Sequence, residues 1–323
     1  MPDGQTQHAS SRGAPAEISA PSHKWLIAIS VMLGATLEIL DSSIVNVSLP
    51  HMQGTFSASV DQIAWVLTSY LIANGIMIPM TGWISSRFGR KRYFLASMAM
   101  FVFASILCGA AQSLDQIVVF RLLQGFAGAA MIPSSQAILM ETFPPNEQQM
   151  AMAVCGIGLQ LAPIAGPTLG GWITDNLNWR WNFYINIPVG IIAFIMAWTF
   201  LQDPPYLGQK KQTKVDYLGI LLLVIGLGTL EIVVDRGQRS EWFSALWVRY
   251  FTMISVCSLI AMVIQELRFP EPIIDLRILL IGDFAIAVIL GTANIAAVYV
   301  VNLINPLFLQ ELMNYTAWKA GLL

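Results

Sequence analysis

Two carboxylic acids stand inside a long apolar stretch near the N-terminus. Residues 25–50 read WLIAISVMLGATLEILDSSIVNVSLP, and Glu38 and Asp41 lie in it one helical turn apart. If this stretch crosses a membrane as a helix, both acids lie where lipid excludes water. A charge in that position is costly, is usually paired with another group, and often marks a proton or substrate pathway. The spacing puts both acids on nearly the same helix face, with Glu38 closer to the middle of the membrane.

Arg121 is the basic residue that could pair with Asp41. It lies inside a later apolar stretch that begins near residue 115. At 1.5 Å per helical residue, Asp41 lies about 8 Å and Arg121 about 9 Å below the same face of a ~30 Å hydrocarbon core. We therefore predict a buried ion pair between them. Two alternatives stay open: Arg121 extends to the headgroups, or the pair only holds helices together while Glu38 is a neutral hydrogen-bonding acid.

The composition indicates which solvent surrounds the chain. Of its 323 residues, 56% are hydrophobic and 11% charged, whereas soluble domains carry roughly 25% charged residues. A chain this long cannot cover its surface with so few polar groups. We therefore expect an all-α membrane protein. A net charge of −2 gives no indication of nucleic-acid binding. Because zinc, phosphate-loop, dinucleotide and nucleophile motifs are missing from the sequence, we expect no enzyme, no metal and no organic cofactor.

Nine apolar segments are long enough to span a bilayer as helices, which takes about 20 residues. They are roughly 25–48, 63–84, 93–111, 115–139, 150–173, 183–201, 217–235, 248–265 and 284–309. Lysine and arginine concentrate in the connections on the side of the N-terminus, which predicts a cytoplasmic N-terminus. Residues 1–24, rich in Ser, Ala, Pro and Gly, are expected to form a disordered cytoplasmic tail.

The segment GWISSRFGRKR (82–92) joins the second and third spans. We expect a tight inner loop in which Gly82 and Gly89 allow a sharp turn and the close approach of another helix. Its basic residues would anchor the loop at the inner surface, and they include Arg87, Arg90 and Lys91. Anchoring alone is the simpler interpretation of these charges.

The fifth span contains GIGLQLAPIAGPTLGGW (156–172), in which small residues recur every fourth position. This spacing gives one small face for the close approach of a neighbour, and it is formed by Gly158, Ala162, Gly166 and Gly170, with Gly171 alongside. Pro163 and Pro167 favour a bend. We predict a bent, close-packed gating helix, with simple helix packing as the alternative.

Four motifs, in this order, resemble those of the major facilitator superfamily: LDSSIVNVSLP, GWISSRFGRK, RLLQGFAGAA and APIAGPTLGG. The segments WRWNFYINIPVG (179–190) and DRGQRSEWF (235–243) are similar to those of its fourteen-span drug:proton antiporter family, the EmrB/QacA type. The resemblance covers about residues 25–323. One departure is Ser86, which stands where the family usually has an acid, and this puts any latch built on that carboxylate in doubt.

The resemblance implies a domain organisation. It predicts a six-helix bundle over 25–202, a linker with two additional helices over 203–283, and the first helix of a second bundle over 284–323. The chain then stops about five spans short of the family's fourteen, which predicts a fragment or a truncated reading frame. Alternating access needs two halves that rock about a central site.

The resemblance also implies a function, which is proton-coupled efflux of lipophilic drugs or toxic compounds across a bacterial inner membrane. Protons would be the coupling ion, and a periplasmic adaptor and an outer-membrane channel are possible partners. Asp41, Arg121 and Glu38 would couple protons to transport, with a proton and a cationic substrate competing at Glu38. Polar residues within spans that are candidates for the substrate cavity are Asn46, Tyr70, Gln124 and Gln136. The alternatives are an uptake carrier, a non-transporting sensor and an inactive remnant.

Overall fold

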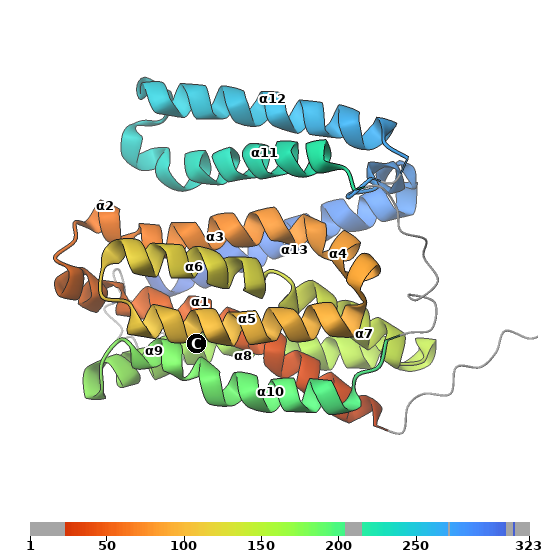
Figure 1. Ribbon diagram of the computed structural model, residues 1–323, viewed down its shortest axis with the longest axis horizontal. Coiled ribbons are helices and arrows are strands. Elements are labelled where there is room, and N and C mark those ends of the chain that lie inside the picture. The colour runs from red at the N-terminus through yellow and green to blue at the C-terminus, as the bar shows by residue number, and fades with distance from the viewer. Residues whose placement is uncertain (1–22, 204–214, 271, 308–312, 314–323) are drawn as a thin grey trace, which may run out of the picture.

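The computed structural model describes residues 23–203, 215–270, 272–307 and 313, and in this part every regular element is a helix (Figure 1). This confirms the expected all-α class. Eight helical segments there are long and apolar enough to cross a membrane, and they coincide with the first eight predicted spans. The ninth predicted span corresponds to the last described helix. The predicted tail up to residue 22 and the chain after residue 313 lie outside the described residues.

In chain order the longer helices are α1 (Lys24–Phe56), α3 (Trp65–Met77), α4 (Thr81–Phe88), α5 (Arg90–Ala110), α6 (Leu114–Gly128), α7 (Met131–Thr142), α8 (Pro145–Asn176), α10 (Asn186–Phe200), α11 (Tyr217–Arg236), α12 (Leu246–Arg268) and α13 (Gly282–Leu307). Single turns connect them: α2 (Val60–Ile63), η1 (Ile78–Met80), α9 (Trp181–Tyr184), η3 (Gln238–Ser240), η4 (Trp242–Ser244) and η5 (Leu276–Leu280). Helices are expected because lipid offers no partners to backbone N–H and C=O groups, which a helix satisfies internally.

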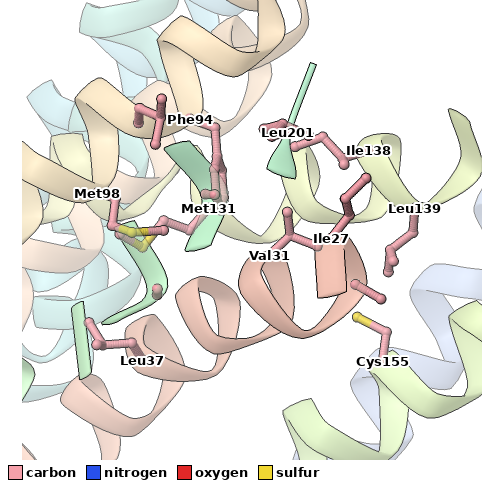
Figure 2. Packing of buried hydrophobic residues seen from close by; sticks show 14 of the residues in the cluster. Ile27, Val31, Leu37, Phe94, Met98, Met131, Ile138, Leu139, Cys155 and Leu201 are labelled. Atoms are coloured by element: carbon pink, nitrogen blue, oxygen red, sulfur yellow. The ribbon is translucent and has the colours of Figure 1, made fainter. Parts of the chain in front are cut away.

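Helix α1 occupies the centre of the first bundle. It packs mainly against α8 and α10, while α3 packs against α6, and α5 packs against α6 and α10. Buried apolar side chains fill the bundle around α1 (Figure 2). Val31 of α1 and Ile138 of α7 belong to this core together with Phe94 and Met98 of α5, and each of these four is at most 2% exposed. The arrangement holds α1 firmly, so the acids on α1 have fixed neighbours.

The connection at residues 82–92 is not a loop, which corrects one expectation. Helix α4 continues to Phe88 and α5 begins at Arg90, so Gly89 alone interrupts the helical chain. The role expected for Gly82 is also wrong, because Gly82 lies inside α4 and a Cβ added there would meet nothing within 4 Å. A glycine inside a membrane helix keeps its backbone hydrogen bonds. The local sequence does not distinguish such a glycine from a glycine in a turn.

The two additional helices form a hairpin outside the first bundle. Helices α11 and α12 pack against each other, and α11 lies on α3 (Figure 1). A separate apolar cluster joins them, with Ile76 of α3 against Leu223 of α11 and Met262 of α12. Among the described residues, α13 packs mainly against η5 and its side chains are largely exposed.

Candidate functional site

The predicted pairing of Asp41 with Arg121 is present in the structure. Arg121 Nη1 donates to Asp41 Oδ2 at 2.6 Å, and both side chains are 0% exposed. This excludes the alternative in which Arg121 extends to the headgroups. Two charges taken out of water are stable together only when good geometry and further hydrogen bonds satisfy their remaining polar atoms.

Those further hydrogen bonds come from neutral amides on two helices. Asp41 Oδ1 accepts from Gln124 Nε2 of α6 at 3.0 Å and from Asn186 Nδ2 of α10 at 2.6 Å. Gln124 also accepts from Arg121 Nη1 at 2.8 Å through its Oε1 atom. Asn186 Nδ2 continues the network to Ser105 Oγ of α5 at 2.9 Å. One carboxylate on α1 is therefore bonded directly to α6 and α10, and through them to α5.

The close approach of α3 and α6 completes the surroundings of Arg121. A Cβ added at Gly125 would lie 2.9 Å from Ala73 Cβ, so only glycine fits between these helices. At this separation Arg121 Nε donates to the Val66 carbonyl at 3.2 Å, and the guanidinium carbon lies 4.2 Å from the centre of the Tyr70 ring. Both contacts stabilise the positive charge. In the described part of the chain, Arg121 Nη2 still has no hydrogen-bond partner.

Glu38 lies in the same interior, one helical turn before Asp41 on α1. Its Oε1 atom accepts from Asn74 Nδ2 of α3 at 2.9 Å, and its side chain is 6% exposed. Its Oε2 atom has no partner among the described residues. Gly128 of α6 provides the space, since a Cβ there would lie 3.0 Å from the Tyr70 hydroxyl and 3.4 Å from Glu38 Cγ. Glu38 is therefore a buried acid with one oxygen free to hold a proton or meet another donor.

The small face of α8 packs against α1, as its spacing predicts. A Cβ added at Gly166 would lie 2.6 Å from Ser43 Cβ, and one added at Gly170 would lie 3.1 Å from Ile44 Cγ2. Helix α8 continues through both Pro163 and Pro167 without interruption. The Pro163 carbonyl accepts from Ser43 Oγ at 3.4 Å, so α1 contacts α8 at the proline itself.

The other two predicted glycines of α8 meet parts of α1 that are flexible or further away. A Cβ at Gly158 would lie 3.0 Å from the end of the flexible Met32 side chain, whereas one at Gly171 would lie 3.8 Å from Val47 Cγ1, an ordinary van der Waals distance. Gly166 and Gly170 are therefore the positions at which this contact requires a glycine.

The turn at Gly89 has a backbone conformation that favours glycine. Its φ of 92° is closed to branched residues. Asp203, which follows α10, accepts from the Lys91 backbone N–H at 2.7 Å through Oδ1, so it caps the start of α5. The Lys91 ammonium group donates to the Trp198 carbonyl at 2.8 Å. Asp203 thus provides a carboxylate at this turn from far along the chain.

Arg87 and Arg90 of this region also have partners. Arg90 forms an ion pair with Glu141 at the end of α7, and the Arg87 guanidinium lies 5.7 Å from the Trp83 ring centre. Ser86 donates to the Trp83 carbonyl at 2.8 Å. The Arg90–Glu141 pair joins α5 to α7, whereas the Arg87 and Ser86 contacts lie within α4.

The four cavity candidates separate into two groups. Tyr70 and Gln124 are at most 3% exposed and belong to the surroundings of the ion pair. Asn46 and Gln136 are exposed, and Asn46 Nδ2 donates to the Ser42 carbonyl of its own helix at 3.2 Å. Contact of these residues with a substrate stays a prediction.

Sequence reasoning missed Asn74 and Asn186, the amides that bind the two acids. It also missed Asn182 of α9, which donates to Thr174 Oγ1 of α8 at 2.7 Å and to Ser48 Oγ of α1. An uncharged polar residue inside an apolar span is the signal that could have indicated Asn74. Within the described residues there is no group of three or more His, Cys, Asp or Glu side chains that could hold a metal ion.

Comparison with known proteins gives a consistent result. A model of the Major Facilitator Superfamily matches residues 31–323. The chain is 38% identical over 298 residues to the multidrug export protein EmrB of Haemophilus influenzae, and the match covers 92% of this chain and 58% of that protein. It is 35% identical over 297 residues to EmrB of Escherichia coli K12 and 37% identical over 301 residues to the probable multidrug resistance protein EmrY of the same strain, with the same coverage. The chain therefore spans little more than half the length of these relatives.

Proposed function

Because this chain belongs to the Major Facilitator Superfamily, we propose that it forms the first bundle and the adjoining helices of an antiporter that exports lipophilic compounds in exchange for protons. The multidrug export proteins to which it is similar support this substrate class. The observation that carries the proposal is the fully buried pair of Asp41 and Arg121, with Glu38 beside it. Ionisable residues inside a membrane tend to mark proton and substrate pathways.

In this mechanism the Asp41–Arg121 pair and Glu38 have different roles. Arg121 and Gln124 both donate hydrogen bonds to Asp41, so these three side chains hold α1 and α6 together. Glu38 has no basic partner among its described contacts and has one free oxygen, so it can hold a proton when no substrate is present. A cationic substrate near Glu38 would favour the charged carboxylate and release that proton. The compound would then leave the cell while protons enter.

The location and partners follow from the same proposal. The protein is placed in the bacterial inner membrane with a cytoplasmic N-terminus, as the distribution of basic residues favours. Its coupling ion is the proton, and it needs no other cofactor. A periplasmic adaptor and an outer-membrane channel would carry the compound onward.

The test is transport by the complete gene product in liposomes with an imposed pH gradient. Antiport moves a lipophilic cation against the direction of proton flow, an uptake carrier moves it with the protons, and a sensor or remnant moves none. Asp41→Asn should abolish gradient-driven transport. Asp115→Asn is the matched control, because Asp115 is exposed in the first turn of α6.

A double variant separates coupling from a purely structural role. Asp41→Asn alone leaves Arg121 buried without a countercharge, which costs about 3–5 kcal/mol. Adding Arg121→Gln removes that charge and should recover most of the lost thermal stability. The double variant should still fail to drive transport from a pH gradient. If it recovers both stability and coupled transport, the pair is structural and the proposal is wrong.

A further inference from the structure

A cavity of about 560 Å³ lies at the ends of α3, α11 and α12, away from the acids of the first bundle. Its volume falls within the range of sites for drug-sized ligands, about 300–1,000 Å³. It is lined by Asp61, Trp65, Ile232, Arg236, Arg239, Ser240, Trp247 and Phe251. The coupling mechanism uses none of these side chains, so the cavity requires a separate explanation.

The apolar part of the cavity is made of large flat side chains. Trp65 belongs to α3, whereas Trp247 and Phe251 lie in the first two turns of α12. Tryptophan at the end of a membrane helix is typical of the headgroup level, where one side of the ring meets lipid tails and the other meets water. An apolar tail of a ligand can therefore pack against these rings.

The charged groups that line the cavity are two arginines and one carboxylate, that of Asp61. Arg236 is 8% exposed and donates from Nη1 to the Asp61 carbonyl at 2.9 Å, and its guanidinium carbon lies 4.6 Å from the Trp65 ring centre. Arg236 Nε lies 3.3 Å from Asp235 Oδ2, while Nη2 has no partner in the described part of the chain. The Arg236 charge is thus only partly balanced.

Arg239 stands at the rim and is more accessible. Its side chain is 48% exposed, and its Nη1 atom lies 3.3 Å from Oδ1 of Asp61, which is 76% exposed. An exposed pair of this kind contributes about 0–1 kcal/mol, so a stronger acceptor can displace Asp61 at little cost. Two arginines would repel a cation. The Trp65 ring could attract a cation to its face, but Arg236 already lies there. These charges favour an anion.

We propose that this cavity binds an amphiphile with an anionic headgroup, such as a fatty-acid carboxylate or a phospholipid phosphate. The headgroup pairs with Arg239 at the rim, above the positive charge of Arg236. The tail packs against Trp247 and Phe251. Basic pockets between membrane helices bind lipid headgroups in the same way.

Photolabelling of the purified, delipidated complete protein tests this proposal. Three probes carry a diazirine in the tail: palmitic acid, phosphatidylglycerol and uncharged hexadecanol. The labelled peptides are mapped by mass spectrometry. We expect one or both anionic probes to label residues 232–251 at concentrations at which hexadecanol gives several-fold less label. The two anionic arms then show whether a free acid or a phospholipid is the preferred source of the headgroup.

Variants test whether photolabelling depends on Arg239 and on the space in the cavity. Arg239→Gln should weaken the apparent affinity of the anionic probe about tenfold, as expected for the loss of one hydrogen bond between charged groups. Arg249→Gln is the matched control, since Arg249 is exposed on α12 outside the cavity lining. Ser240→Trp keeps both arginines but fills the cavity, and should remove the label while the protein elutes as a folded species. Equal labelling by hexadecanol, or equal affinity of the Arg239 and Arg249 variants, would overturn the proposal.

Discussion

Replacement of Gly166 by alanine probes the contact between α8 and α1. An added Cβ would lie 2.6 Å from Ser43 Cβ, whereas carbon atoms in contact prefer about 3.5–4.0 Å. Rotation of the Ser43 side chain cannot relieve this overlap, because a Cβ atom is fixed to its backbone. The two helices must therefore separate by roughly 1 Å at this level.

The expected cost follows from this overlap. Overpacking of a well-packed interior typically costs 1–3 kcal/mol. A gain of up to about 1 kcal/mol in helix propensity offsets part of it. Gly156→Ala on the same helix is the matched control, because it receives the same gain and its Cβ meets nothing within 4 Å. At about 2 °C for each kcal/mol, the Gly166 variant should unfold roughly 2–6 °C below the control.

Thermal unfolding of the purified protein in detergent measures this difference, and the liposome assay measures its effect on transport. We expect Gly166→Leu to insert normally into the membrane but to lose export, since its larger side chain holds the helices further apart. Equal melting temperatures for the Gly166 and Gly156 alanine variants would refute the contact argument. Normal export by Gly166→Leu at wild-type expression would refute the gating role.

Three further predictions concern the turn at Gly89 and the second acid, Glu38. Gly89→Val should lower stability by about 1–3 kcal/mol, because the φ of 92° at Gly89 strains a branched residue. Gly82→Val is the control: a Cβ there meets nothing within 4 Å, so melting temperature and transport should change much less. Ser86→Asp should change transport little in the wild type, because Asp203 already caps α5, but should partly rescue Asp203→Asn; a large gain from Ser86→Asp alone would contradict this. Glu38→Gln should reduce export of a cationic substrate about tenfold, the equivalent of one lost charge contact of about 1.4 kcal/mol, and a matched neutral substrate should lose less; equal losses for both would exclude a role of the Glu38 charge in recognition.

Much of the helical framework was predictable from run length and charge. The constant rise of a helix also placed Asp41 and Arg121 at equal depth, and this is why their pairing could be deduced without knowledge of the packing. The four-residue spacing on α8 identified a contact face in the same way, although only Gly166 and Gly170 require glycine there.

The partners that depend on helix rotation could not be deduced. Asn186 lies in a segment whose aromatic residues indicate the membrane interface, yet its side chain points into the bundle and bonds Asp41. Asn74 bonds Glu38 only because α3 turns that face toward α1. The turn predicted at Gly82 was wrong because a glycine in a helix and a glycine in a turn give the same local sequence signal. Depth follows from counting residues, whereas rotation follows from the packing of whole helices.

The sharing of Asp41 by three donors also limits how this protein can evolve. Arg121, Gln124 and Asn186 all use the same carboxylate. A single substitution leaves several buried groups unsatisfied and costs about 3–5 kcal/mol, a large part of the 5–15 kcal/mol that keeps a typical protein folded. Joint replacement of all four residues by apolar ones can leave stability nearly unchanged. A lineage reaches that state only through an unstable variant with a single substitution. Descendants should therefore keep all four residues or have lost them together.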